Sequence, residues 1–281
     1  MVVARTGYLG RTVDEPVQSP GHWLESKEGW EKLPPHPGRA IKPAPGRNEG
    51  APNIWRLTAF DDEHVFISHG DWDKNDGATM LVSLNPKTRE YTNHGIHDTE
   101  AFDDTRILNG RIYLPYMDPT GYWDQAYPFA VYPPFDHEMT KTDGLHFFDV
   151  AEVDGTLFVT GSALRDDVSY AAVNVSSDQG RTWSLEFPTP ASGDVSVSRS
   201  YQIEDANGTV YAKTLSKWYK RLGPNQWELD ETFVPPPTPG QQYTGGTVWE
   251  EPQALAKTST HWVTGDRFGD IYIKPLTPWR T

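Results

Sequence analysis

The sequence contains no cysteine, which excludes disulfide bonds, thiolate catalysis and metal sites with cysteine ligands. No apolar run approaches the ~20 residues that a membrane-spanning helix needs. The first residues, Met1–Gly7, show no basic segment followed by an apolar stretch, so we expect no secretory signal peptide. The sequence thus predicts a soluble protein that is made in the cytoplasm and does not insert into membranes.

Basic residues are also few. Lys and Arg number 25 against 39 Asp and Glu, the formal net charge is −14, and the basic residues form no cluster. Such a chain would repel nucleic acid and anionic membranes, so neither is an expected partner. The nine histidines never take the His-x-x-x-His spacing, and histidine-ligated zinc is not expected.

Aromatic residues, glycine and proline are, by contrast, plentiful. Aromatic residues make up 12% of the chain, and Gly and Pro number 24 each. This composition suits short strands that pack large rings between sheets and are joined by frequent turns. Long helices are not expected.

A unit of about 50 residues recurs along the chain from residue 53 onward. Each unit has two strands joined by a tight turn, then a second hairpin; the tight turns start at Asp61, Asn109, Asp154, Asn207 and Ser259. Three of these turns carry Asn-Gly or Asp-Gly, which favour type I′ hairpins. Four short strands per unit are typical of a propeller blade. The sequence therefore predicts an all-β fold, a five-bladed β-propeller of four-stranded antiparallel blades, at about 53–95, 97–142, 144–188, 195–233 and 246–281.

Residues 1–52 form a Pro-rich N-terminal arm in which recurring prolines prevent regular structure. The exception is a predicted short hairpin at 22–33. A terminal strand that completes the last sheet would remove a free edge and close the ring. We expect this hairpin to help close the ring; the alternative is a surface hairpin unrelated to closure.

The segment Ser176–Trp183 matches the Asp-box pattern Ser-x-Asp-x-Gly-x-Thr-Trp in full. The carboxylate is expected to cap backbone N–H groups, the glycine to take a left-handed conformation and the indole to pack between sheets. The structural residues of the box are Ser176, Asp178, Gly180, Thr182 and Trp183. The chain resembles sialidase-like Asp-box propellers, and the resemblance implies that the box lies on an outer hairpin, away from the active site.

The segments His64–Trp72, Asn75–Gly77 and His146–Val150 resemble uncharacterised propeller proteins encoded by bacteriophages and bacteria. The resemblance implies a virion-associated propeller and supplies no catalytic residues. We therefore expect a non-enzymatic virion component on the tail or capsid exterior, made in the host cytoplasm and present in multiple copies. Its expected partners are other virion proteins and a host-surface glycan, with the Pro-rich arm draped over a neighbouring subunit.

The alternative function is a glycoside hydrolase or lyase that acts on a polysaccharide. A sialidase is not expected, because no arginine lies in a Phe/Tyr-Arg-Ile-Pro motif. Five-bladed glycosidases place three carboxylates around the axial opening, and the candidates are Asp104 (or Asp103), Asp149 and Glu251 (or Glu250). Asp104 and Asp149 occupy the same position before their turns, which favours a structural role around the channel instead.

Aromatic residues in the loops are candidates for stacking on sugars or for protein contacts, with packing between blades as the alternative. Together with Arg199 near the start of an inner strand, these candidate binding residues are Trp72, Tyr122, Trp123, Tyr127, Trp218 and Phe268. Asp71–Gly77 resembles a calcium loop with Asp71, Asp73 and Asn75 as ligands, but its glycine falls one place late. An ordinary loop is the favoured interpretation, and no other cofactor is expected.

Overall fold

The computed structural model describes residues 29–40, 54–70, 78–102, 105–119, 125–133, 139–165, 168–188, 199–214, 217–235, 254–265 and 270–276. This part of the chain is all-β apart from one 3-10 turn, η1 (Pro37–Ala40). Within it, no helix is long and apolar enough to span a membrane.

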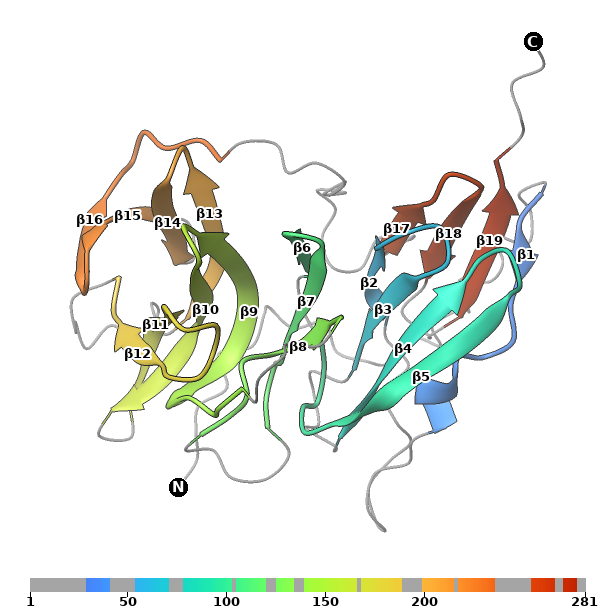
Figure 1. Ribbon diagram of the computed structural model, residues 1–281, viewed down its shortest axis with the longest axis horizontal. Helices are drawn as coiled ribbons and strands as arrows, with labels where there is room; N and C mark the ends of the chain where they lie inside the picture. Colours follow the sequence, from blue (N-terminus) through green and yellow to red (C-terminus); the bar gives the residue numbers. More distant parts are fainter. Residues whose placement is uncertain are drawn as a thin grey trace, which may run out of the picture.

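The strands form five antiparallel sheets, which we call blades I to V (Figure 1). Blade I contains β2 (Ile54–Ala59), β3 (Val65–His69), β4 (Thr79–Asn85) and β5 (Glu90–His97). Blade II contains β6 (Arg106–Leu108), β7 (Arg111–Pro115) and β8 (Phe129–Tyr132). Blade III contains β9 (Gly144–Val153), β10 (Thr156–Arg165), β11 (Val168–Ser176) and β12 (Ser184–Glu186).

Blade IV contains β13 (Ser200–Ala206), β14 (Thr209–Thr214), β15 (Lys217–Gly223) and β16 (Gln226–Leu229). Blade V contains β17 (Ala254–Lys257), β18 (His261–Gly265) and β19 (Ile271–Pro275), together with β1 (Glu31–Lys32). The protein is a five-bladed β-propeller, as the sequence repeat predicts. Blade II differs from the expected four strands. Among its described residues the outer position holds only an Ala126–Thr142 bridge, with N–H···O distances of 3.1 and 2.9 Å.

The first hairpins of blades II, III and IV turn where the sequence predicts. Asn109, Asp154 and Asn207 have φ of 49°, 49° and 56°, and the glycine after each also has a positive φ. Two successive left-handed residues are the requirement of a type I′ turn, which only Gly, Asn and Asp meet at low cost. The two other turns are held by side chains instead. In blade I the Asp61 carboxylate accepts the His64 N–H at 2.7 Å.

The N-terminal segment completes blade V, as the sequence predicts for a terminal strand. Glu31 pairs with Ile273 and Lys32 with Tyr272, so β1 is the outer strand of the last sheet. Leu33, which is buried, donates its N–H to the Ile271 carbonyl at 2.8 Å. Residues 22–28 of the predicted hairpin lie outside the described residues.

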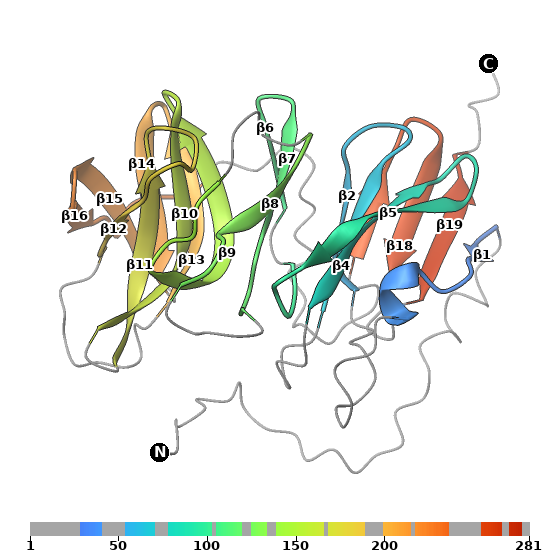
Figure 2. The same ribbon diagram turned by 60° about the horizontal axis from the view of Figure 1, so that its bottom comes forward.

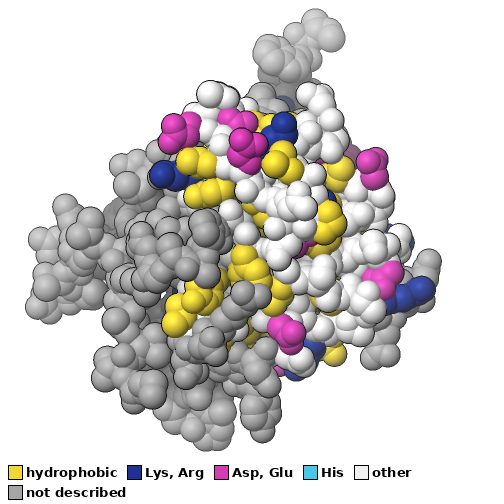
Figure 3. Space-filling view, turned by 90° about the vertical axis from the view of Figure 1, so that its left-hand side faces the viewer, with side chains coloured by type: hydrophobic (Ala, Val, Ile, Leu, Met, Phe, Trp, Pro, Cys, Tyr) yellow, Lys and Arg dark blue, Asp and Glu magenta, His cyan; other side chains and the backbone are white. Residues whose placement is uncertain are grey.

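Neighbouring blades pack face to face in the order V, I, II, III, IV, along an arc that Figures 1 and 2 show from two sides. Apolar cores fill the boundaries; examples are Ile54 and Ile273 between V and I, Phe66, Tyr113 and Phe147 from I to III, and Ala151 and Ile203 between III and IV. The outer side of the left-hand blades carries apolar side chains in several separate places among charged ones (Figure 3). The cores therefore sit between sheets, as expected for strands that bury both faces.

Candidate functional site

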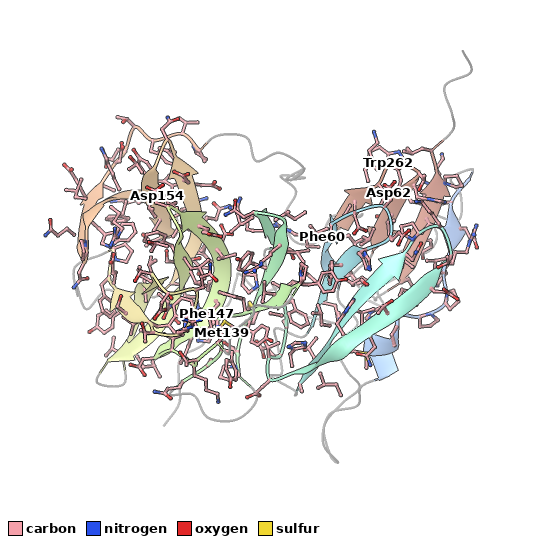
Figure 4. All side chains as sticks on the ribbon, in the orientation of Figure 1. Phe60, Asp62, Met139, Phe147, Asp154 and Trp262 are labelled. Carbon is pink, nitrogen blue, oxygen red and sulfur yellow. The ribbon has the colours of Figure 1, made fainter. Side chains whose placement is uncertain are left out.

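Each sheet is an up-and-down meander, so its two ends differ in chemistry. The tight turns of the first hairpins lie at one end, the turn face, where Asp62 and Asp154 mark blades I and III (Figure 4). At the other end the first strand of each blade starts and the second strand stops. We call this second end the mouth face. Phe147, early in β9, lies toward this end in the same view.

His146, near the start of β9 on the mouth face, has a backbone conformation that is unusual for a strand. Its φ is 51°; every other described non-glycine residue with positive φ lies in a turn between strands. The β9–β10 register shifts at this point, between Thr160 and Ser162. A left-handed residue costs about 1–3 kcal/mol unless its surroundings impose it, and such residues concentrate at functional sites. His146 is therefore the starting point for the candidate site.

The His146 side chain contacts Asp118, through its Nδ1 and the Asp118 Oδ1. Asp118 follows β7 of the neighbouring blade II, and both side chains are mostly buried, at 15% and 12% exposed. Glu100, which is buried, donates its backbone N–H to the Asp118 carbonyl at 2.8 Å. Two carboxylate residues thus lie on adjacent backbone segments, with an imidazole from blade III against one of them.

An aromatic pair lies beside this group on the same face. The rings of Phe148 in β9 and Tyr201 in β13 are 4.9 Å apart between centroids. Arg199, which directly precedes β13, places its guanidinium carbon 5.7 Å from the Phe148 ring centre. Ala101 and Met117 of blade II complete the apolar contact. The site therefore combines an imidazole against a carboxylate with aromatic rings and a cation, drawn from blades II, III and IV.

Asp149, the one candidate carboxylate among the described residues, is held entirely in the interior. It is 0% exposed, and its two oxygens accept from Arg106 Nε at 2.6 Å and Nη2 at 2.7 Å. It also accepts the backbone N–H groups of Val150 at 2.9 Å and Ile203 at 3.0 Å. These bonds join blades II, III and IV, and they favour the structural interpretation of Asp149. The other candidates, Asp104 and Glu251, and their alternatives, Asp103 and Glu250, lie outside the described residues.

The same buried group includes Glu204, whose Oε1 accepts from Arg106 Nη2 at 2.9 Å. Burial raises the pKa of Glu204, and the Arg106 charge opposes that rise. Burial lowers the pKa of Arg106, but the Asp149 and Glu204 charges more than reverse this, so its net pKa is raised. One cation thus serves two carboxylates at the centre of three blades.

The predicted aromatic candidates have different surroundings. Tyr127 is 37% exposed, with Lys141 Nζ 5.5 Å from its ring centre. Trp218 is only 8% exposed and packs against Phe233, with ring centroids 5.1 Å apart, which is a packing role. The remaining aromatic candidates and the predicted calcium ligands lie outside the described residues: Trp72, Tyr122, Trp123, Phe268, Asp71, Asp73 and Asn75. In the part of the chain that the structure describes, no group of three His, Asp or Glu could hold a metal.

The Asp-box forms the turn between β11 and β12, away from the mouth face. The Asp178 carboxylate accepts from the Thr182 N–H at 2.9 Å, the Thr182 hydroxyl at 2.7 Å and the Ser176 hydroxyl at 2.8 Å. Slight burial raises the pKa of Asp178, but these bonds outweigh it and lower that pKa to about 2. Gly180, at φ +90°, has the expected left-handed conformation.

Sequence reasoning missed His146, Asp118 and Glu100. The available signal was a histidine inside a short segment that is otherwise apolar, Gly144–Phe148. The register shift that gives His146 its positive φ depends on pairing with β10, and the contact with Asp118 depends on the next blade. The residue pattern of β9 alone predicts neither the register shift nor the contact with Asp118.

No family model matches the chain, and no curated protein matches it. Among solved structures, the GH43_1 enzyme from Xanthomonas citri complexed with xylotriose aligns at 12% identity and a TM-score of 0.36, over 84% of this chain and 90% of that one. The exo-beta-1,3-galactanase from Phanerochaete chrysosporium with beta-1,3-galactotriose also aligns at 12% identity and a TM-score of 0.36, over 56% of this chain. This chain spans 43% of that galactanase. At these scores the similarity carries no argument about function, and no match bears on the expected virion role.

Proposed function

We propose that the protein recognises a carbohydrate chain at the mouth face, at the site formed by blades II, III and IV. The observation that carries the proposal is the strained backbone of His146 beside the Asp118 carboxylate. A histidine at positive φ in a strand lowers the stability of the fold. Such strain is typical of residues that bind a ligand, and the His146 imidazole can hydrogen-bond to a polar one. The site residues are Glu100, Asp118, His146, Phe148, Arg199 and Tyr201.

The chemistry of these side chains suits a sugar. Carboxylate and imidazole groups accept and donate hydrogen bonds to hydroxyls, and the Tyr201 ring offers an aromatic face for C–H groups. Arg199 is partly exposed and held over Phe148, so its N–H groups can reach a bound hydroxyl or acidic sugar. A site with a few convergent polar groups on aromatic walls is the usual form of a small-molecule site.

The experiment is binding of the full chain to a panel of soluble polysaccharides by calorimetry. His146→Gly removes the imidazole while a glycine accepts the φ of 51° without strain, so this variant should fold and lose binding. Tyr201→Ala should weaken binding at least tenfold. Arg181→Ala, an exposed arginine on the Asp-box turn, is the matched control and should bind as wild type. The proposal fails if wild type binds no polysaccharide, or if His146→Gly and Tyr201→Ala bind as wild type does.

Hydrolysis of the bound chain is the second candidate function. The observation that favours it is the adjacency of Glu100 and Asp118 through the Glu100 N–H···O bond. Glycoside hydrolysis uses a pair of carboxyl groups, one as acid and the other as base or nucleophile. Release of reducing ends by wild type, lost in both Glu100→Gln and Asp118→Asn while polysaccharide still binds, would support an enzyme. Binding without any release would support recognition alone.

The expected virion location and the expected partner proteins stay predictions. They are compatible with glycan recognition, because attachment to a host surface needs a binding site and no chemistry. Mass spectrometry of purified phage particles from a strain that carries this coding sequence would find the chain at many copies per particle. Its absence from intact particles, with the protein present in the infected cells, would contradict the location.

A further inference from the structure

We propose that a groove on the turn face, between blades II and III, is a second binding site and takes one neutral sugar residue. The groove has a volume of about 230 Å³ and is lined by Asn109, Arg111, Tyr113, Glu152, Leu157 and Gln179. Glu152 lies near the end of β9 and His146 near its start, so the groove and the mouth face are at opposite ends of that strand. The inference does not rest on the proposed function.

The groove has two facing walls. Arg111 and Tyr113 are two residues apart on β7, so both side chains project from the same face of blade II. Glu152 and Leu157 are opposite each other across the β9–β10 pair and form the wall of blade III. Asn109 and Gln179, both exposed and both in turns with positive φ, stand at the rim. The rim position follows from the Asp-box turn and the Asn-Gly turn, which end at the same face.

Tyr113 forms the floor, with only 2% of its surface exposed. Burial, then the Glu152 charge, raise the pKa of its phenol to about 12, while the Arg111 charge and its hydrogen bond to the phenol act in the opposite direction. The phenol therefore keeps its proton at neutral pH. Tyr113 thus adds to the lining of the groove a nearly buried polar group that a charged neighbour holds in place.

The charges of the groove favour a neutral ligand. One guanidinium and one carboxylate balance each other, so neither an anion nor a cation gains a net attraction. Sugar hydroxyls both donate and accept: they can donate to Glu152 and accept from Arg111, while the two rim amides do either. Leu157, which is 1% exposed, adds a small apolar part to the lining. The volume is below the ~300–1,000 Å³ of pockets for drug-sized ligands, which fits a single pyranose.

The repeat does not require these residues. The position after the turn glycine is Arg111 in blade II but Thr156 in blade III and Thr209 in blade IV. At the boundary between blades III and IV the counterpart of Tyr113 is Phe158, and Arg221 lies over its ring at 5.2 Å. Arg221 thus covers the ring of Phe158 there, whereas at the boundary of blades II and III Tyr113 is part of the lining of the groove.

The test is saturation-transfer NMR of the full chain with a panel of methyl glycosides of neutral hexoses and pentoses. At least one glycoside should give a saturable signal in wild type. Arg111→Met and Glu152→Gln should each reduce that affinity at least tenfold, and Tyr113→Phe, which keeps the ring, should weaken it by less. Arg181→Met removes an arginine outside the groove and should leave the signal unchanged. Melting temperatures within a degree or two of wild type confirm that the variants fold.

His146→Gly separates this site from the mouth face, because a groove ligand should bind that variant as it binds wild type. The proposal is overturned if no neutral glycoside binds, or if glycoside binding survives both Arg111→Met and Glu152→Gln. It is equally overturned if free amino acids or anions bind through Arg111 and neutral glycosides do not, since that result assigns the groove to another ligand class.

Discussion

Trp183 of blade III donates its indole N–H to the backbone carbonyl of Thr140, 3.1 Å away, on the segment that follows blade II. Thr140 returns two bonds to the same turn: its N–H to the Gly180 carbonyl at 2.9 Å and its hydroxyl to the Arg181 carbonyl at 2.9 Å. The Trp183 ring also meets Phe129 edge-on, with centroids 6.2 Å apart. The Asp-box therefore fastens blade III to blade II, at a place where the described residues of blade II form only a single bridge in the outer position.

Removing the cap of this turn should destabilise the fold. Asp178→Ala leaves the Thr182 N–H and the Thr182 and Ser176 hydroxyls without their acceptor, and we expect a loss of about 1–2 kcal/mol in the free energy of unfolding. Urea denaturation would measure it. Ser177→Ala, an exposed residue of the same turn, is the control and should change little. Equal midpoints for Asp178→Ala and wild type would contradict the prediction.

Breaking the buried Arg106–Asp149 ion pair, which joins blades II to IV, should destabilise the fold more than removing the Asp178 cap. Asp149→Ala leaves Arg106 with only the Glu204 carboxylate and should cost about 3–5 kcal/mol, as breaking a buried ion pair does. The double variant Arg106→Met/Asp149→Ala should be less destabilised than the sum of the two single changes, because neither Arg106 nor Asp149 is left buried without the other, and Glu204 loses its partner equally in the single variant Arg106→Met. Thermal melts of the four proteins make this comparison. Additive losses would show that the pair does not act as a unit.

The attachment of the N-terminal segment to blade V should depend more on the buried Leu33 side chain than on the surface ion pair of Glu31. Leu33→Ala creates a cavity between blades V and I, with an expected loss of about 2–5 kcal/mol. Glu31→Ala breaks a bidentate contact with Arg89, but both side chains are about half exposed, so the loss should be below about 1 kcal/mol. Limited proteolysis near residues 33–40 would report detachment of β1. A larger effect of Glu31→Ala than of Leu33→Ala would reverse our interpretation.

Acid should weaken blade I through His69. Burial lowers the pKa of His69 from 6.5 to about 4, against a bond from its Nε2 to the Met80 carbonyl that raises it. Because the folded-state pKa is lower, the fold favours the neutral ring. Its contribution is present above pH 6.5 and is lost as the pH falls toward 4.

The comparison is between wild type and His69→Gln at pH 7.5 and pH 5. Wild type should lose more stability than the variant over this range, by roughly 1–3 kcal/mol. His94, His97 and His261 also have lowered pKa values, so both proteins will respond to acid, and the difference between them isolates His69. Parallel pH profiles would rule out His69 as a source of acid sensitivity.

The sequence predicts features that are local and repeated. Asn-Gly and Asp-Gly pairs identify the hairpin turns, since few residues accept two successive left-handed conformations, and the Asp-box identifies the β11–β12 turn with all its bonds. The completion of the last sheet by an N-terminal strand could also be predicted, because the final unit is too short to supply its own outer strand.

The site could not be predicted in this way. Asp149 attracts attention as a carboxylate in register with Asp104, yet its partners Arg106 and Ile203 belong to two other blades. Trp218 follows a loop in the sequence, but the segment containing Phe233 folds back over it. In each case the decisive contact comes from a residue outside the strand itself, and no spacing rule connects the two.

The pairing of β1 with β19 also sets an order of events during synthesis. Lys32 and its partner Asp270 are 238 positions apart, so the ribosome releases one long before it makes the other. All the described strands of blades I to IV have been synthesised by residue 229. Blade V is complete only after β19 has been synthesised and has paired with β1, which was translated near the beginning. Until then the edge of β19 has open N–H and C=O groups, which are a template for pairing with a second chain. Nascent chains that emerge close together on one polysome can therefore exchange N-terminal segments. The β1 strand of one copy would then pair with β19 of the other and link the two copies.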